Sequence, residues 1–151
     1  MRKVIFLMVV LVFALVLAAC GGGGEPAAPA EPVAPGAATG GDAAAGKELF
    51  AQSVLAGNAG CATCHSLEAG KTLVGPSMAG IASRAGSTVA GESAEQYIRQ
   101  SIMDTNAFLA KGCNAADPEA PCAANLMPQD WPAKLSEQQI DDLVAYLLTL
   151  K

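Results

Sequence analysis

The pentapeptide Cys61-Ala62-Thr63-Cys64-His65 constrains this 151-residue chain more than any other feature. Two thiols three residues apart lie on one face of a helical turn, and the next residue can aim an imidazole at the same point. His65 is the only histidine of the sequence, so any mechanism that needs two imidazoles is excluded. The motif therefore predicts one site at which two thiols and one imidazole act together.

The C-x-x-C-H spacing is the attachment motif of c-type haem, in which both thiols form thioethers with one porphyrin and the histidine binds its iron. Two other kinds of site also use C-x-x-C. A thioredoxin-like pair would follow a strand of a βαβ unit, and we expect no strand here. A structural zinc site would need a second close pair of ligands, but Cys113 and Cys122 are farther apart. The motif thus predicts one covalent haem c on Cys61, Cys64 and His65.

The first residues predict export to a membrane surface. Residues 1–19 form a signal peptide, because their apolar run from Val4 to Ala19 is shorter than the roughly 20 residues of a membrane span. The run ends Leu17-Ala18-Ala19-Cys20, which resembles the lipobox of bacterial lipoproteins, where the cysteine carries a diacylglycerol. The alternative is an uncleaved helical anchor. Both versions hold the rest of the chain outside the cytoplasm.

The chain then divides into a tether and one domain. Residues 20–45 combine the lipidated Cys20 with a stretch of glycine, alanine and proline, a composition typical of an extended linker. Residues 46–151 form the haem domain, which is large enough for one modest core. Aromatic residues make up only 5% of the sequence, and a core so poor in rings usually needs help from a group that is not protein.

The charge of the chain restricts its partners. The formal net charge is −5, and it becomes −7 once Arg2 and Lys3 leave with the signal peptide. No cluster of lysine or arginine follows, so binding to nucleic acid is excluded. Since an acidic domain cannot present a broad basic docking ring, we expect either a mostly apolar docking surface or a basic partner.

Periodicity and capping signals predict a small all-α fold of three to four helices around the haem. Asp42 can cap the first helix, and Ser93 with Gln96 and Ser136 with Gln139 form two capping boxes. No alternating strand pattern occurs. Long loops between the helices are expected to wrap the cofactor. The expected helices cover about residues 43–52, 79–84, 93–104 and 136–148.

Residues 42–151 resemble the class I cytochromes c. Residues 46–50, Gly-Lys-Glu-Leu-Phe, are similar to the family's first helix, whose glycine lets the last helix cross close by. Gly75-Pro76 is similar to the family's Gly-Pro pair, which implies that the Pro76 carbonyl accepts the Nδ1–H of His65. Arg84 is similar to the arginine that reaches a haem propionate; the alternative is a solvated surface charge.

The resemblance also implies the sixth iron ligand. Met127, in Asn125-Leu126-Met127-Pro128, matches the family's ligand loop, whereas Met78 and Met103 are expected to pack as gap-fillers. Trp131 is expected to pack over the haem or its loop without a chemical role. Apolar wrapping of the haem is expected from Leu73, Met78, Ile81 and Leu126.

Cys113 and Cys122 depart from the family's common pattern. The segment between them looks like an insertion before Met127, and in an oxidising compartment the two cysteines should form a disulfide. We expect this bridge to stiffen the Met127 loop or to shape a partner surface.

A His/Met-ligated haem has no open site for substrate, so these features predict an electron-transfer protein and not an enzyme. The expected role is a membrane-tethered one-electron carrier of a respiratory or photosynthetic chain in the bacterial cell envelope. Its donor would be a quinol-oxidising complex, and its acceptor an oxidase or a soluble electron carrier. One alternative is a fixed haem subunit of a quinol-oxidising complex such as alternative complex III, or of a terminal reductase. A second is a ligand-binding or peroxidase-type haem, which requires that Met127 does not ligate.

Overall fold

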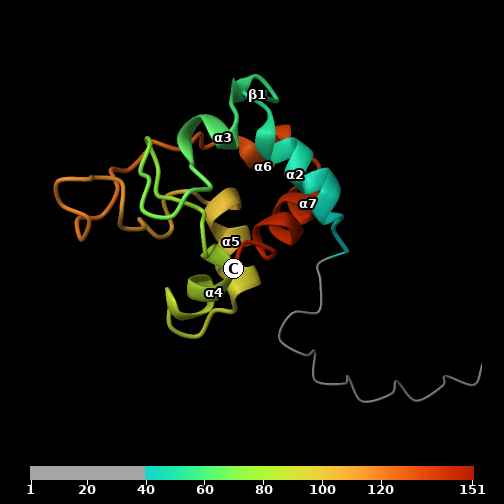
Figure 1. Ribbon diagram of the computed structural model, residues 1–151. Coiled ribbons are helices and arrows are strands. Elements are labelled where there is room, and N and C mark those ends of the chain that lie inside the picture. The colour runs from blue at the N-terminus through green and yellow to red at the C-terminus, as the bar shows by residue number, and fades with distance from the viewer. Residues whose placement is uncertain (1–39) are drawn as a thin grey trace, which may run out of the picture. The chain divides into compact units, whose positions relative to one another are not determined.

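Helices from the two ends of the described chain pack against each other (Figure 1). The computed structural model describes residues 40–151, so the predicted signal peptide, Cys20 and the tether up to residue 39 lie outside the described residues. The first helix, α2, spans Ala43–Ala51, and the last, α7, spans Glu137–Leu147. They are drawn in cyan and red in Figure 1.

Short elements and long loops fill the chain between these helices. No helix within residues 40–151 has the length and apolar character needed to cross a membrane. The elements in order are β1 (Val54–Leu55), β2 (Asn58–Ala59), α3 (Cys61–Cys64), α4 (Ile81–Arg84), the 3-10 helix η1 (Ala85–Ser87), α5 (Ala94–Met103) and α6 (Trp131–Lys134).

Several of these short elements were not expected from the sequence. The prediction that no strand precedes Cys61 is wrong, because β1 and β2 form an antiparallel hairpin just before α3. Two residues per strand are too few to produce an alternating pattern of apolar and polar residues. The hairpin therefore cannot be recognised from the sequence by its periodicity. A hairpin of this kind is not a βαβ unit, so it does not favour a thioredoxin-like site. The four-residue helix α6 was also missed, for the same reason of length.

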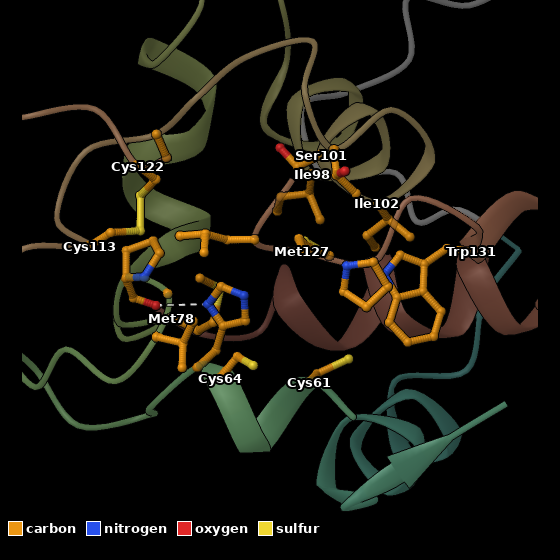
Figure 2. Close-up of a pocket in the computed structure, with 18 of the residues that line it drawn as sticks. Cys61, Cys64, Met78, Ile98, Ser101, Ile102, Cys113, Cys122, Met127 and Trp131 are labelled. Carbon is orange, nitrogen blue, oxygen red and sulfur yellow. Dashed lines mark hydrogen bonds between the residues drawn. A yellow bond between two sulfur atoms is a disulfide. The ribbon is translucent and has the colours of Figure 1, made fainter. Parts of the chain in front are cut away.

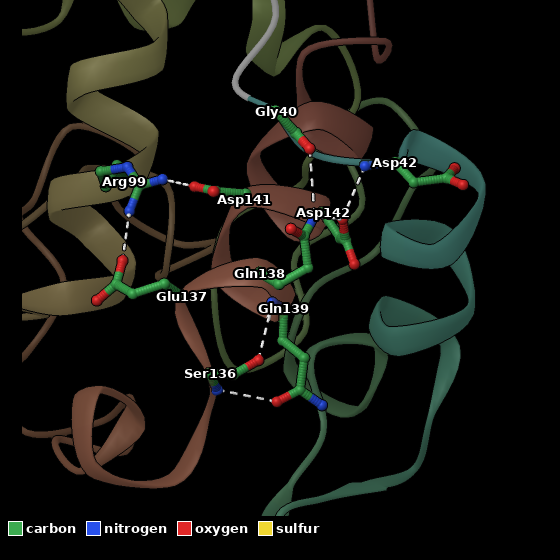
Figure 3. Close-up of polar contacts among 9 residues, drawn as sticks. All are labelled: Gly40, Asp42, Arg99, Ser136, Glu137, Gln138, Gln139, Asp141 and Asp142. Carbon is green, nitrogen blue, oxygen red and sulfur yellow. Dashed lines mark hydrogen bonds and ion pairs between the residues drawn. The ribbon is translucent and has the colours of Figure 1, made fainter.

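The predicted caps are confirmed. The carboxylate of Asp42 accepts two backbone N–H groups of the first turn of α2. Ser93 and Gln96 form a complete capping box at the start of α5, and Ser136 and Gln139 form another at the start of α7 (Figure 3). Each cap satisfies N–H groups that have no partner inside the helix, which contributes about 1 kcal/mol per helix.

The inner face of α7 forms the centre of the core. Ile140, Leu143 and Val144 are the largest fully buried side chains among the described residues. Phe50 of α2 and Tyr146 of α7 stack in a tilted pair with ring centroids 5.6 Å apart. Burial of each such side chain contributes roughly 1.5–3 kcal/mol, so this contact holds the two ends of the domain together.

The first described residues are tied to α7 by a buried carboxylate (Figure 3). Asp142 is only 7% exposed, and its Oδ1 accepts the backbone N–H of Asp42 at 2.7 Å and the Nε2–H of Gln138 at 2.9 Å. Gln138 Nε2 also donates to the carbonyl of Gly40 at 3.2 Å. The chain therefore enters the domain at a fixed position beside α7.

Gly46 is the point at which α2 and α7 approach most closely. A Cβ at this position would overlap the carbonyl of Asp142 and would lie 2.9 Å from the Cβ of Tyr146. Since both obstacles are backbone or the first side-chain atom, neither can move away cheaply. The close crossing predicted for Gly46 is confirmed.

Replacing Gly46 with alanine should therefore lower the free energy of unfolding by about 1–3 kcal/mol, although alanine favours the helix itself. Thermal unfolding followed by circular dichroism measures the effect as a lower Tm. Gly40→Ala is the matched control, because a Cβ there meets nothing within 4 Å. Equal Tm values for the two variants would contradict the tight crossing.

Candidate functional site

An apolar cavity opens between α3, α5, α7 and the loops that join them (Figure 2). The space inside it, including the solvent at its open mouth, measures about 1270 Å³. Cys61, Cys64, His65 and Met127 all line this cavity. The structure thus brings the predicted attachment residues and the predicted sixth ligand to one place.

Helix α3 presents both cysteines of the motif to the cavity. Figure 2 shows their sulfur atoms leaving the same side of the helix. Burial raises the pKa of the Cys61 thiol to about 11, and the neighbouring Cys64 adds to the rise. A nucleophilic cysteine needs a lowered pKa instead. The described residues contain no group of three or more histidine, cysteine or acidic side chains that could hold a metal ion. This argues against a structural zinc site.

The imidazole of His65 is held in one tautomer. Its Nδ1 lies 2.9 Å from the carbonyl oxygen of Pro76, which can only accept, so Nδ1 carries the proton and Nε2 carries the free lone pair. Burial lowers the pKa of His65, against a smaller opposing effect of the Pro76 carbonyl, and this favours the neutral ring. A neutral ring with a free Nε2 is the form that binds a metal.

Gly75 lies directly against the ring of His65. A Cβ on Gly75 would overlap the imidazole, and its backbone N–H donates to the carbonyl of Cys64 at 2.9 Å. Only glycine lets the loop pass this close. The Gly-Pro pair therefore does two things: Gly75 gives the ring room, and Pro76 orients it.

The three methionines of the described domain lie in different surroundings. Met127 is partly buried on the irregular segment before α6 and lines the cavity. Met78 also lines it, but its backbone N–H donates to the carbonyl of Ser66, next to His65, at 2.8 Å. Met103 ends α5 and packs on the core without lining the cavity.

Arg84 ends α4 and is not among the residues that line the cavity. Its guanidinium donates to the backbone carbonyls of Ser77 and Ala79. Burial lowers its pKa, against a smaller opposing effect of Tyr97. The contact with a haem propionate stays a prediction.

Cys113 and Cys122 are joined in a disulfide, with Cα atoms 5.2 Å apart, and both line the cavity. The N–H of Cys122 donates to the carbonyl of Ala110 at 2.7 Å. The neighbouring Gly112 carbonyl accepts the hydroxyl of Thr72 at 2.9 Å. The disulfide loop, residues 113–122, is thus tied to the segment that precedes Gly75.

Some wall residues differ from those expected. Met78, Ile81 and Leu126 line the cavity. Leu73 does not, and its neighbour Val74, which is also exposed, lines it instead. An irregular loop has no repeating backbone geometry, so the sequence pattern does not indicate which of two adjacent side chains faces the cavity. Sequence reasoning also missed the polar wall residues Thr105, Asn106 and Asn125. The one sequence signal that could have identified these wall residues is the position of Asn125, two residues before the predicted ligand Met127.

The chemistry of this wall fits the predicted haem c. The two thiols suit the two thioether bonds, and the free Nε2 of His65 suits the iron. Trp131 lines the cavity and is 2% exposed, and its buried Nε1–H has no hydrogen-bond partner in the described domain. An orphaned buried donor points to an acceptor that the protein does not supply, and a haem propionate is such a group.

Comparison with known proteins gives the same answer. The sequence pattern that defines the family described as Cytochrome c matches residues 43–151. Cytochrome c2 of Rhodopseudomonas palustris is 33% identical over 126 residues, covering 73% of this chain and 99% of that protein. Cytochrome c-554(547) of Halothiobacillus neapolitanus is 35% identical over 111 residues, covering 74% and 99%. Cytochrome c2 iso-2 of Magnetospirillum molischianum is 33% identical over 92 residues, covering 60% and 91%.

No protein of solved structure gives a significant match. The family match covers the whole helical domain, which confirms the predicted all-α fold, the covalent haem c and the role in electron transfer. The chain belongs to the cytochrome c family, whose members are electron-transfer proteins and not enzymes themselves.

Proposed function

We propose that this domain is a one-electron carrier in which His65 Nε2 and the Met127 sulfur would hold the haem iron. One observation carries the proposal: His65 and Met127 line the same cavity as the two cysteines of the motif. The Pro76 carbonyl holds Nδ1, so Nε2 is the nitrogen free to bind.

Met127 is the best candidate for the sulfur ligand. The backbone bond between Met78 and Ser66 keeps Met78 on the side of the cavity that carries His65. Met103 is directed into the core by α5. Met127 comes from a separate segment, the loop before α6, and lines the same cavity.

Two side-chain ligands leave no open position for a small molecule. The haem supplies a ferric/ferrous couple, and a thioether ligand favours its ferrous form and raises the potential. The apolar wall formed by residues such as Ile81, Ile98 and Leu143 excludes water and acts in the same direction. A ligand-binding or peroxidase-type haem would need Met127 to stay away from the iron.

The partner surface is expected at the mouth of the cavity. Val74, Phe108 and Leu126 line the cavity and are also exposed. The lysines of the adjoining loops are neutralised by glutamates at 2.9 and 3.0 Å, in the pairs Lys71–Glu68 and Lys111–Glu119. This supports docking through an apolar surface, both for a mobile carrier and for a fixed subunit. The partners we propose for it are a quinol-oxidising complex as donor and an oxidase or a soluble electron carrier as acceptor.

We also propose that Cys20 carries a lipid and that the residues between Cys20 and the described domain tether it to the outer side of the cytoplasmic membrane. The last residues of the expected linker, 43–45, belong instead to α2. The disulfide between Cys113 and Cys122 supports an oxidising compartment such as the periplasm. The lipobox-like end of the apolar run supports the anchor.

Replacing Met127 with leucine should abolish the weak long-wavelength Met-to-iron(III) band of the oxidised protein and lower its reduction potential, because leucine keeps the volume but cannot ligate. The ferrous variant should bind carbon monoxide rapidly near neutral pH, and the wild type should not. Met78→Leu is the matched control and should retain the band. Rapid carbon monoxide binding by the wild type would favour the ligand-binding alternative.

Replacing Cys113 and Cys122 together with serine should lower the free energy of unfolding by about 2.5–3 kcal/mol, the chain-entropy value for a loop of about ten residues. Denaturant unfolding of the haem-loaded protein measures this loss. The Met-to-iron(III) band should also weaken, because the loop that precedes Met127 is freed. Unchanged stability and an unchanged band would show that the bridge does not stiffen this loop.

Cells supplied with labelled palmitate should label the wild-type protein and leave Cys20→Ser unlabelled, because the thiol of Cys20 is the acylated group. Mass spectrometry of the mature protein should find Cys20 as its first residue. A membrane-bound wild type without label, and still beginning at Met1, would instead support the uncleaved anchor.

A further inference from the structure

The segment around Met127 is held by hydrogen bonds to the residues that follow α5. Asn125 and Gln129 flank Met127, and their partners are Thr105 and Asn106. We call these four residues the amide clamp. It joins two stretches of chain that are about twenty residues apart and holds the Met127 segment on both of its sides.

Asn106 is the centre of the clamp. Its Oδ1 accepts the backbone N–H of Asn125 at 3.0 Å, and its Nδ2 donates to the side-chain oxygen of Asn125 at 3.0 Å. The same Nδ2 donates to the side-chain oxygen of Gln129. Both N–H donors of this amide and its oxygen are therefore used.

Gln129 completes the clamp from the other side of the methionine. Its Nε2 donates to the hydroxyl of Thr105 and to the backbone carbonyl of Met127 itself. Asn125 has a φ of +63°, a left-handed conformation that asparagine tolerates better than most residues. The reciprocal bonds to Asn106 hold the backbone in this turn just before Met127.

These contacts belong to the wall of the haem cavity. Thr105, Asn106, Asn125 and Met127 all line it. A methionine side chain has three rotatable bonds, so its binding to iron from a mobile loop would cost conformational entropy. A loop that is already held in position reduces this cost.

We infer that Asn106 is a positioning residue for Met127, and that the amide clamp sets the fraction of molecules in which Met127 is bound to the iron. This inference rests on the proposed His65/Met127 ligation. The side-chain hydrogen bonds of Asn106 go to Asn125 and Gln129, and it acts on Met127 through these two residues.

The test uses the full-length, haem-loaded protein. The Met-to-iron(III) band is followed during an alkaline titration, and the reduction potential is measured at neutral pH. Asn106→Ala removes three hydrogen bonds, so the population without bound Met127 should rise roughly tenfold. A tenfold change in an equilibrium coupled to one proton moves the midpoint pH of band loss down by about one unit. The potential should fall as well.

Two further variants remove only some of these hydrogen bonds, so their midpoint shifts can be compared with that of Asn106→Ala. Asn106→Asp keeps the acceptor for the Asn125 N–H and loses both donors, so its midpoint should also fall. Asn125→Gly keeps the left-handed backbone and the N–H, and loses one acceptor, so its shift should be smaller. Since Asn106 is exposed, its variants should fold, and circular dichroism checks this.

Asn114→Ala is the matched control. Asn114 lies in the disulfide loop, where its Oδ1 accepts the N–H of Ala116, within the same loop, at 2.9 Å. Its midpoint and potential should equal those of the wild type. If Asn106→Ala and Asn106→Asp behave like Asn114→Ala while the wild type has the band, the inference is overturned and the ligation stands. A wild type without the band overturns the ligation and this inference together.

Discussion

The crossing of α2 and α7 at Gly46 is the contact on which the rest of the domain depends. It brings the backbones so close that a single Cβ would not fit, and it buries Phe50 against Tyr146. Because the hairpin and α3 follow α2 directly, the crossing also places Cys61 and Cys64 opposite the inner face of α7. Leu143 and Leu147 then serve both the core and the cavity wall.

The residues around the cavity orient the His65 ring and exclude water rather than supply reactive chemistry of their own. His65 has one tautomer because Pro76 accepts its Nδ1–H, and it has room for its ring because residue 75 is glycine. Burial raises the pKa of the Cys61 thiol, which favours its protonated form. Long loops, which would be costly in an ordinary core, here line an apolar cavity whose residues fit one large cofactor.

Local signals were predicted well. Asp42, Ser93 and Ser136 cap their helices with contacts that span two or three residues, and such contacts depend little on the rest of the fold. Elements of two to four residues, such as the hairpin before α3 and the helix at Trp131, are too short to show a period. The choice of Val74 over Leu73 for the cavity wall follows from the path of an irregular loop, which no sequence pattern records.

The sequence by itself determined the chemistry of the site, because Cys61, Cys64 and His65 are adjacent and need only one turn of helix to act together. It also determined where the helices begin, through side chains that bond to their own neighbours. Only the tertiary structure decided which distant segments meet: Asn106 with Asn125, Thr72 with the disulfide loop, and Met127 with the cavity that holds His65. The physical reason is that such contacts form only after the core has packed, when burial has set the position of each loop.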